Sequence, residues 1–410
     1  MVGREEKVWR SLEIILFCTA FTGVVLTLYF VFTKLRFYYG VDYHMAHAWL
    51  AGYKQTGVFY PKDTVFYNFP LTVIAFGPWL MFPVGVAVKL KFAQTALLSV
   101  VCVWLSLKLK LGILKMENSA PFAFFILLAT FFLTQLCYLN IYVEVAACLM
   151  ACLYFQQQGK EGWAGFFLSL AVVFKVFLAP LFIVPLLTRK YKLFAWAVIF
   201  ILCSGCLSIA LFGVSTHTDM LRAMGETYAR MRLHGISYPY VADGFAGWQD
   251  MFNKLVMTGL IDKGMVFPLT LTMAGLYGCL FLYTCYLIHR CYENTASDSG
   301  YYARVFASMV IFCIGFNFRF DHGTLLFSAL PFFGDLRKSE RGLLVLSLTM
   351  MTLSRLLVEQ VFSIMGWIGA GSVVSKLFYV LSFQFIGINL LVLMVVNHWV
   401  NVIWNKKEVS

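Results

Sequence analysis

The sequence predicts an all-α polytopic membrane protein with about 10–12 transmembrane or re-entrant helices, because many of its apolar runs approach the roughly 20 residues that cross a bilayer. Of its 410 residues, 61% are hydrophobic and only 13% are charged, and the mean hydropathy is +0.79. A soluble domain carries about 25% charged residues. This composition argues against a soluble enzyme, a nucleic-acid-binding protein and a secreted disulfide scaffold.

The formal net charge of +12 fits a membrane protein whose Lys and Arg residues gather in cytoplasmic loops. The first apolar run, Leu12–Thr33, follows Arg4, Lys7 and Arg10, so its start is expected in the cytoplasm. The run is too long for a signal-peptide core and lacks a small-residue cleavage site, so we expect it to remain as an anchor. Lys406 likewise predicts a cytoplasmic C-terminus.

Further apolar runs follow, and we expect residues 1–410 to form a single membrane domain. The runs are 71–86, 88–107, 119–139, 141–156, 163–188, 191–213, 266–288, 303–318, 323–334, 342–362 and 374–399. With both termini inside, two long extracytoplasmic segments remain, 34–70 and 214–265. The active site is expected on that outer face.

Two stretches do not fit simple spans. Residues 71–107 must cross once although they hold two apolar runs, separated around Pro83, Lys89 and Lys91. Run 163–188 has basic residues at both ends but is too short for two spans of about 20 residues. We expect short or re-entrant helices there, which membranes tolerate only where protein or a water-filled cavity covers them.

The first outer segment, 34–70, contains an acidic residue at the start of a predicted interfacial helix. Asp42 can N-cap a helix that runs to Gly52, with the apolar face formed by Met45, Ala48, Trp49 and Ala51. A cap alone accounts for Asp42 and stabilises by about 1 kcal/mol. The alternative is a carboxylate that accepts a proton from a substrate hydroxyl at the membrane surface.

Two histidines and several aromatic residues follow Asp42. His44 and His47 have a spacing that permits a shared metal, but a fourth ligand is missing, so we expect no metal site. Tyr60 and Tyr67 lie among further aromatic residues around Pro61. They fit an interfacial belt or a wall on which a sugar stacks.

Charges within or between apolar runs are the other candidates for chemistry. Lys175, midway through run 163–188, either extends to the interface or binds a lipid phosphate as a point charge. Arg319 and His322, in NFRFDHG, either neutralise a phosphate or, through an Arg319–Asp321 pair, only stabilise a short loop. Glu144 is expected near the outer mouth of the bundle.

The order of these features resembles the GT-C glycosyltransferases, in particular glycosyltransferase family 87, the polyprenyl-phosphate-mannose-dependent mannosyltransferases. The resemblance is carried by Asp42 with YHMAHAWLAG and VFYP, by FYNFPLTVIAFGPWLMFP, by GWAGFFLSLAVVFKVFLAPLFIVPLL with Lys175, and by FRFDHGTLLFSALPFF with His322. GWQDMFNKL, which contains Trp248, resembles a weaker motif. Where the family commonly carries Gly-Gln after the third span, this chain has Leu139-Asn140.

The resemblance implies a GT-C-like bundle and an inverting glycosyltransferase that moves a sugar, mannose in the first instance, from a polyprenyl phosphate to a lipid or glycan acceptor. Asp42 would be the general base, and Lys175, His322 and Arg319 would bind the donor phosphate. Contacts to substrate are expected from His44, His47, Tyr60, Tyr67, Asn140 and Trp248. No cofactor, metal or nucleic acid is expected.

Two alternatives remain open from the residues alone. A carrier or flippase for a lipid-linked or anionic solute would also use broken helices and the intramembrane Lys175. A non-catalytic subunit of an envelope complex would need neither Asp42 nor Lys175. The enzyme is favoured because polar residues gather in the outer half of the predicted bundle.

Overall fold

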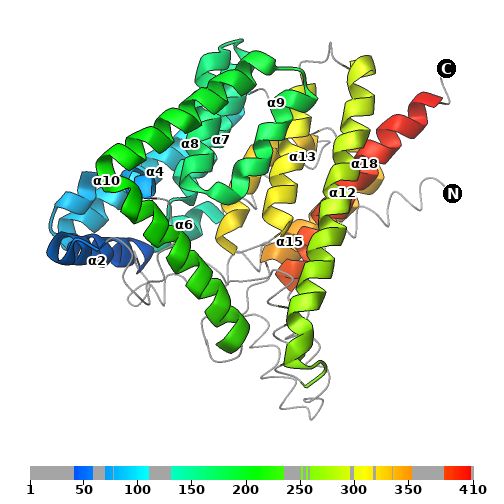
Figure 1. Cartoon of the computed structure of the whole chain (residues 1–410). Coiled ribbons are helices and arrows are strands. Elements are labelled where there is room, and N and C mark those ends of the chain that lie inside the picture. The colour runs from blue at the N-terminus through cyan, green and yellow to red at the C-terminus, as the bar shows by residue number, and fades with distance from the viewer. Residues whose placement is uncertain are drawn as a thin grey trace. The chain divides into compact units, whose positions relative to one another are not determined.

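The computed structural model is helical in the residues that it describes, where no strand occurs (Figure 1). These residues are 41–58, 70–76, 78–109, 131–234, 251–252, 255–256, 259–295, 300–316, 320–334, 336–352 and 383–407. The chain is therefore an all-α polytopic membrane protein, as its composition predicts.

Four helices within this described part are long and apolar enough to cross a membrane. They cover Val84–Lys108, Tyr191–Ala223, Lys263–Tyr292 and Phe385–Trp404. On the exposed surface of these helices lie large apolar side chains, such as Leu97, Leu202 and Leu282, each more than 60% exposed. A protein in water rarely exposes such continuous apolar surface, whereas lipid tails cover it without cost.

The described residues fall into two compact units. The unit that we call the N-terminal unit comprises those of Val31–Lys110 and Phe132–Gly235, and the C-terminal unit comprises those of Leu111–Phe131 and Ile236–Ser410. Each unit is described by itself below.

The described part of the N-terminal unit begins with helix α2, followed by short helical turns and then by longer helices. Its elements are α2 (Val41–Thr56), η1 (Pro70–Thr72), α3 (Val73–Phe76), η2 (Pro78–Met81), α4 (Val84–Lys108), α6 (Leu133–Tyr138), α7 (Tyr142–Gln157), α8 (Glu161–Phe174), η4 (Val176–Phe182), α9 (Ile183–Leu187) and α10 (Tyr191–His234). Helix α8 packs against both α7 and α10, and α4 packs against α7 (Figure 1).

Small and hydroxyl-bearing residues line the buried side of α4. Thr95, Ser99, Cys102 and Ser106 are all buried and follow one another at intervals of three or four residues. Small side chains let membrane helices approach closely. The hydroxyls of Ser99 and Ser106 donate to carbonyls one turn earlier in the same helix. Both hydroxyls are therefore hydrogen-bonded although they are buried.

The stretch 71–107 contains one helix of membrane-spanning length, in agreement with the single crossing predicted for it. Residues 70–82 form short turns, and α4 starts at Val84, directly after Pro83. The prediction that Lys89 and Lys91 separate two apolar helices is wrong, because both residues lie inside α4, close to its start. Proline fits just before a first turn, since it has no N–H to donate.

Run 163–188 is divided into short helical pieces, as predicted. Helix α8 ends at Phe174, and the 3-10 helix η4 and the five-residue α9 follow. Pro180 lies inside η4. A proline there cannot donate to the carbonyl four residues earlier and clashes with it, so α8 cannot continue as a regular helix through this region.

Helix α10 is bent at Gly213, which has φ +80° and ψ 159°. Glycine reaches this left-handed backbone region without steric cost. Near the bend, Thr216 donates to the carbonyl of Phe212 at 2.6 Å, and His217 Nδ1 lies 2.8 Å from the carbonyl of Gly213. The first part of segment 214–265, to His234, is therefore a continuation of α10.

The C-terminal unit contains η6 (Lys263–Met265), α12 (Val266–Thr295), α13 (Tyr301–Phe316), η7 (Phe320–Ala329), α14 (Leu330–Gly334), α15 (Lys338–Thr352) and α18 (Phe383–Lys407). Helix α15 packs against α18, and α13 packs against η7 and α18. Glu340, in the first turn of α15, lies 3.2 Å from His398 Nδ1 and accepts the amide of Arg337 at 3.0 Å. Burial opposes ionisation of Glu340, but these hydrogen bonds prevail and its pKa is lowered.

Gly165 is predicted to be needed where α8 meets α10. A Cβ atom at this position would lie 2.8 Å from the backbone nitrogen of Ala197 and 3.0 Å from the carbonyl of Leu193. Gly165→Ala should therefore destabilise the protein by about 1–3 kcal/mol, the usual cost of overpacking. Thermal unfolding in detergent measures this effect. Gly205→Ala in α10, where nothing lies within 4 Å, is the matched control, and equal midpoints would contradict the prediction.

Candidate functional site

Lys175 lies where α8 breaks, in extended backbone with φ −141° and ψ 92°. Its amide donates to the carbonyl of Ala171 at 3.0 Å, and its own carbonyl accepts from Leu178 at 3.0 Å. Its ammonium group lies 4.4 Å from the centre of the Tyr142 ring, within the range of a cation–π contact. The chain thus directs a lysine from the junction of two short helices towards the first residue of α7.

The turn before α7 is shaped by a non-glycine residue in left-handed backbone. Leu139 ends α6 with φ +54°, a conformation that costs ordinary residues about 1 kcal/mol or more. Asn140 follows, is buried, and accepts the amide of Ile141 on its Oδ1 at 2.6 Å. Asn140 therefore lies at the end of α7 that Lys175 contacts through Tyr142; their shared role in one site stays a prediction.

Helix α2 carries Asp42, His44 and His47. It starts at Val41, so Asp42 belongs to its first turn and is not the N-cap that the sequence predicts; the orientation of the Asp42 side chain lies outside the described residues. An acidic residue in a first turn still interacts favourably with the helix dipole.

Helix α2 packs one face against the protein. Tyr43, Ala46 and Trp49 are buried, whereas Ala48 and Ala51 are exposed; that the face with Ala48 and Ala51 lies in the membrane interface stays a prediction. The large aromatic rings gain more from burial than alanine methyl groups do, because the gain scales with apolar area. Burial also raises the pKa of the Tyr43 hydroxyl, so this neighbour of Asp42 stays neutral.

The two histidines of α2 have different surroundings. His44 is exposed. His47 Nε2 lies 3.0 Å from the carbonyl of Phe82, and since a carbonyl only accepts, this nitrogen donates. No group of three potential metal ligands occurs among the described residues.

A buried ion pair joins α4 to α7, and sequence reasoning missed it. Lys91 Nζ lies 2.5 Å from Glu144 Oε1, and the side chains are 0% and 6% exposed. The signal in the sequence was a basic and an acidic residue inside apolar runs, since such charges are costly unless they are paired. Glu144 was noted there and Lys91 was taken for a helix boundary, so the pairing was not predicted.

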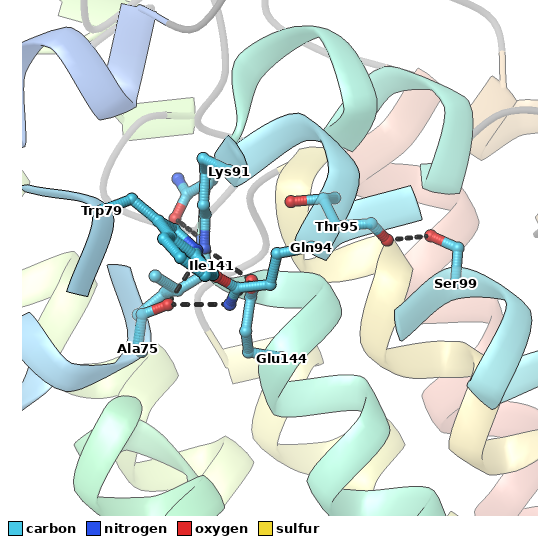
Figure 2. A network of polar contacts seen from close by, with 9 residues as sticks. Ala75, Trp79, Lys91, Gln94, Thr95, Ser99, Ile141 and Glu144 are labelled. Carbon is cyan, nitrogen blue, oxygen red and sulfur yellow. Dashed lines mark hydrogen bonds and ion pairs between the residues drawn. The ribbon is translucent and has the colours of Figure 1, made fainter. Parts of the chain in front are cut away.

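Three further groups complete this network (Figure 2). The carbonyl of Ala75 accepts from Lys91 Nζ at 3.0 Å, and Gln94 Nε2 donates to Glu144 Oε1 at 3.0 Å. Trp79 Nε1 donates to Gln94 Oε1 at 2.6 Å. The second carboxylate oxygen of Glu144 is buried without a hydrogen-bond partner among the described residues. The network joins α4 and α7 to α3 and η2, which contain Ala75 and Trp79.

His322 lies in the C-terminal unit, in η7, and is buried. Next to it, a Cβ atom on Gly323 would clash with the ring of Phe131. A 3-10 helix of ten residues is unusually long. Since Lys175 belongs to the other unit, the meeting of His322 with Lys175 stays a prediction. The remaining predicted site residues, Arg319, Tyr60, Tyr67 and Trp248, lie outside the described residues.

The sequence profile of glycosyltransferase family 87 matches residues 66–313. The chain belongs to glycosyltransferase family 87. The matched region includes four of the polar residues described above, Lys91, Asn140, Glu144 and Lys175. Neither a curated protein nor a solved structure matches the chain.

Family membership favours an enzyme over the carrier and the assembly subunit that the residues left open. As a glycosyltransferase, the protein uses a sugar donor and an acceptor.

The Lys91–Glu144 pair yields a prediction about stability. Glu144→Leu should lower the free energy of unfolding by about 3–5 kcal/mol, because it leaves a buried ammonium without its carboxylate. The double variant Lys91→Met/Glu144→Leu should recover most of that loss, since apolar residues often replace a buried ion pair at little cost. Denaturant unfolding in one detergent compares the two. Equal losses in the single and double variants would contradict a direct interaction.

Proposed function

We propose that the protein transfers a sugar, most directly mannose, from a polyprenyl-phosphate carrier to a hydroxyl of a lipid or glycan acceptor at the extracytoplasmic membrane face. Membership of family 87 supports the reaction class. The lipid-linked donor is supported by a composition that leaves little soluble surface and by the cation of Lys175 at a helix break in an apolar region.

In the proposed reaction, Asp42 accepts the proton of the acceptor hydroxyl as the oxygen attacks the anomeric carbon. A new glycosidic C–O bond forms with inversion, while the bond between that carbon and the phosphate oxygen breaks. Polyprenyl phosphate leaves with the bonding electron pair. Lys175, His322 and Arg319 would stabilise its negative charge. No cofactor takes part.

The observation that carries this proposal is the position of Lys175. Its backbone is extended between two short helices, so its side chain is not confined to a packed helix face. Its ammonium lies over the ring of Tyr142, the first residue of α7. A fixed cation in surroundings of low dielectric stabilises developing charge more strongly than in water, and the ammonium of lysine binds phosphate as a compact point charge.

The role of Asp42 is testable by an isosteric change. Asp42→Asn should lower transfer by about 10²–10⁴-fold, the usual contribution of a general base, while the protein remains folded. Purified protein in liposomes, given several polyprenyl-phosphate sugars and analysed by mass spectrometry, provides the measurement. Asp262→Asn, at an exposed aspartate, is the control. Full activity of Asp42→Asn would exclude it as the base.

The role of Lys175 predicts a separate effect. Lys175→Met should lower kcat by about 10²–10³-fold, comparable with the loss of one group that stabilises charge in the transition state. Lys160→Met removes an exposed lysine just before α8 and should leave the rate unchanged. Steady-state kinetics with the active donor compare the two variants. Equal rates would contradict a phosphate-binding role for Lys175.

A further inference from the structure

Helix α2, which carries Asp42, is attached by two contacts to the turns formed by residues 70–82. The rings of Tyr43 and Phe76 lie 6.2 Å apart between centroids, and His47 Nε2 lies 3.0 Å from the carbonyl of Phe82. Both contacts are made within the first two turns of α2. These two contacts link the start of α2 to Phe76 and Phe82, whereas further along the helix Trp49 packs against Phe212 and Met220 of α10.

Residues 70–82 cannot fix their own geometry. They consist of η1, α3 and η2, each three or four residues long. Such short pieces are unstable alone, because helix nucleation is unfavourable and few internal hydrogen bonds form. Their arrangement must come from contacts with the long helices.

Helices α8 and α10 contact η1, and the buried charge network supplies the polar contacts of residues 75–79 (Figure 2). Lys91 donates to the carbonyl of Ala75 at 3.0 Å, and Gln94 donates to the same carbonyl at 3.4 Å. The ammonium of Lys91 also lies 5.6 Å from the centre of the Phe76 ring. Phe76 thus contacts Lys91 on one side of the network and Tyr43 of α2 on the other.

The second attachment of α2 leads to the same carboxylate. Phe82 directly follows η2, and η2 contains Trp79, which donates to Gln94. Gln94 in turn donates to Glu144 Oε1, the oxygen that is paired with Lys91. Both routes from α2 therefore end at the Lys91–Glu144 pair.

Stability alone does not require charges at these positions, since apolar residues of similar size often replace a buried ion pair without loss. An apolar pair, however, removes the shorter of the two hydrogen bonds to the carbonyl of Ala75, that from Lys91, and leaves only the 3.4 Å contact from Gln94, which itself loses Glu144 as an acceptor. What the charges add is a fixed position for residues 75–82.

We propose that Lys91 and Glu144 form a positioning pair for glycosyl transfer, which holds residues 75–82 and through them the turns of α2 that carry Asp42. This inference rests on the proposed function, in which Asp42 is the general base. Neither member of the pair touches the substrate. Displacement of a catalytic group by about 1 Å can cost about 10²-fold in rate, so release of α2 would appear as lost turnover.

Amide hydrogen exchange tests the positioning directly. In Lys91→Met/Glu144→Leu, the amides of α2 should exchange about tenfold faster or more than in the wild type, because local opening sets these rates. Peptides from α18 provide the internal reference. The matched control is Lys89→Met/Glu161→Gln, which changes an exposed lysine on α4 and a partly exposed glutamate on α8. Unchanged exchange of α2 in the pair variant would overturn the proposal.

Kinetics test the consequence for catalysis. The same double variant should lose about 10–100-fold in kcat, with the KM for the donor changed by less than about threefold. Its pH–rate profile should keep the inflections of the wild type, since Asp42 remains the base. The single variant Lys91→Arg should retain part of the wild-type activity, because its guanidinium can still donate to Glu144 and to the carbonyl of Ala75. A folded double variant with wild-type kcat would overturn the proposal, as would the loss of the acidic limb of the profile, which would make Glu144 itself the base.

Failure of the proposed function gives a different result. If the wild type forms no glycoside from any polyprenyl-phosphate sugar, the proposed function and the catalytic part of this role both fall, while hydrogen exchange still decides whether the pair holds α2. If the wild type is active, Asp42→Asn is inactive and the pair variant retains full kcat, the proposed function stands and only the positioning role is wrong.

Discussion

The ion pair between Lys91 and Glu144 is the interaction on which the arrangement of the N-terminal unit depends. Its two charges have been removed from solvent, where each would otherwise be hydrated. In such surroundings an unpaired charge costs several kcal/mol, so the pair leaves α4 and α7 little freedom to slide past each other. The small side chains between these helices allow the close approach that the pair needs.

The start of α7 gathers the polar groups of this unit. Within five residues it presents Asn140, Tyr142 and Glu144, and a lysine from another element reaches each of the last two. Their environments differ: Lys91 is fully buried beside a carboxylate, whereas Lys175 lies over an aromatic ring and is partly exposed. This difference favours a structural role for Lys91 and contact with an anionic substrate for Lys175.

The sequence predicted those features that depend on composition or on local stereochemistry. The all-α membrane fold follows from the apolar content. The division of run 163–188 into short helices was predicted from its length and its basic ends, and Pro180 explains why no regular helix continues there.

Two other features of the site were beyond the sequence. Lys91 and Glu144 are 53 positions apart, and nothing in either apolar run identifies the partner. The bend at Gly213 was also not predicted, since a glycine within an apolar run is compatible with a straight helix. The pairing of Lys91 with Glu144 is a tertiary feature, fixed by packing between segments distant in the chain.

The most direct measurement is an experimental structure of the protein with a polyprenyl-phosphate sugar bound. In that structure, the donor phosphate should lie within hydrogen-bond distance of Lys175, and the Asp42 carboxylate should face the anomeric carbon. Lys91 and Glu144 should remain paired without touching the donor. A donor phosphate bound to Lys91, with the bond to Glu144 broken, would contradict the proposed roles of these residues.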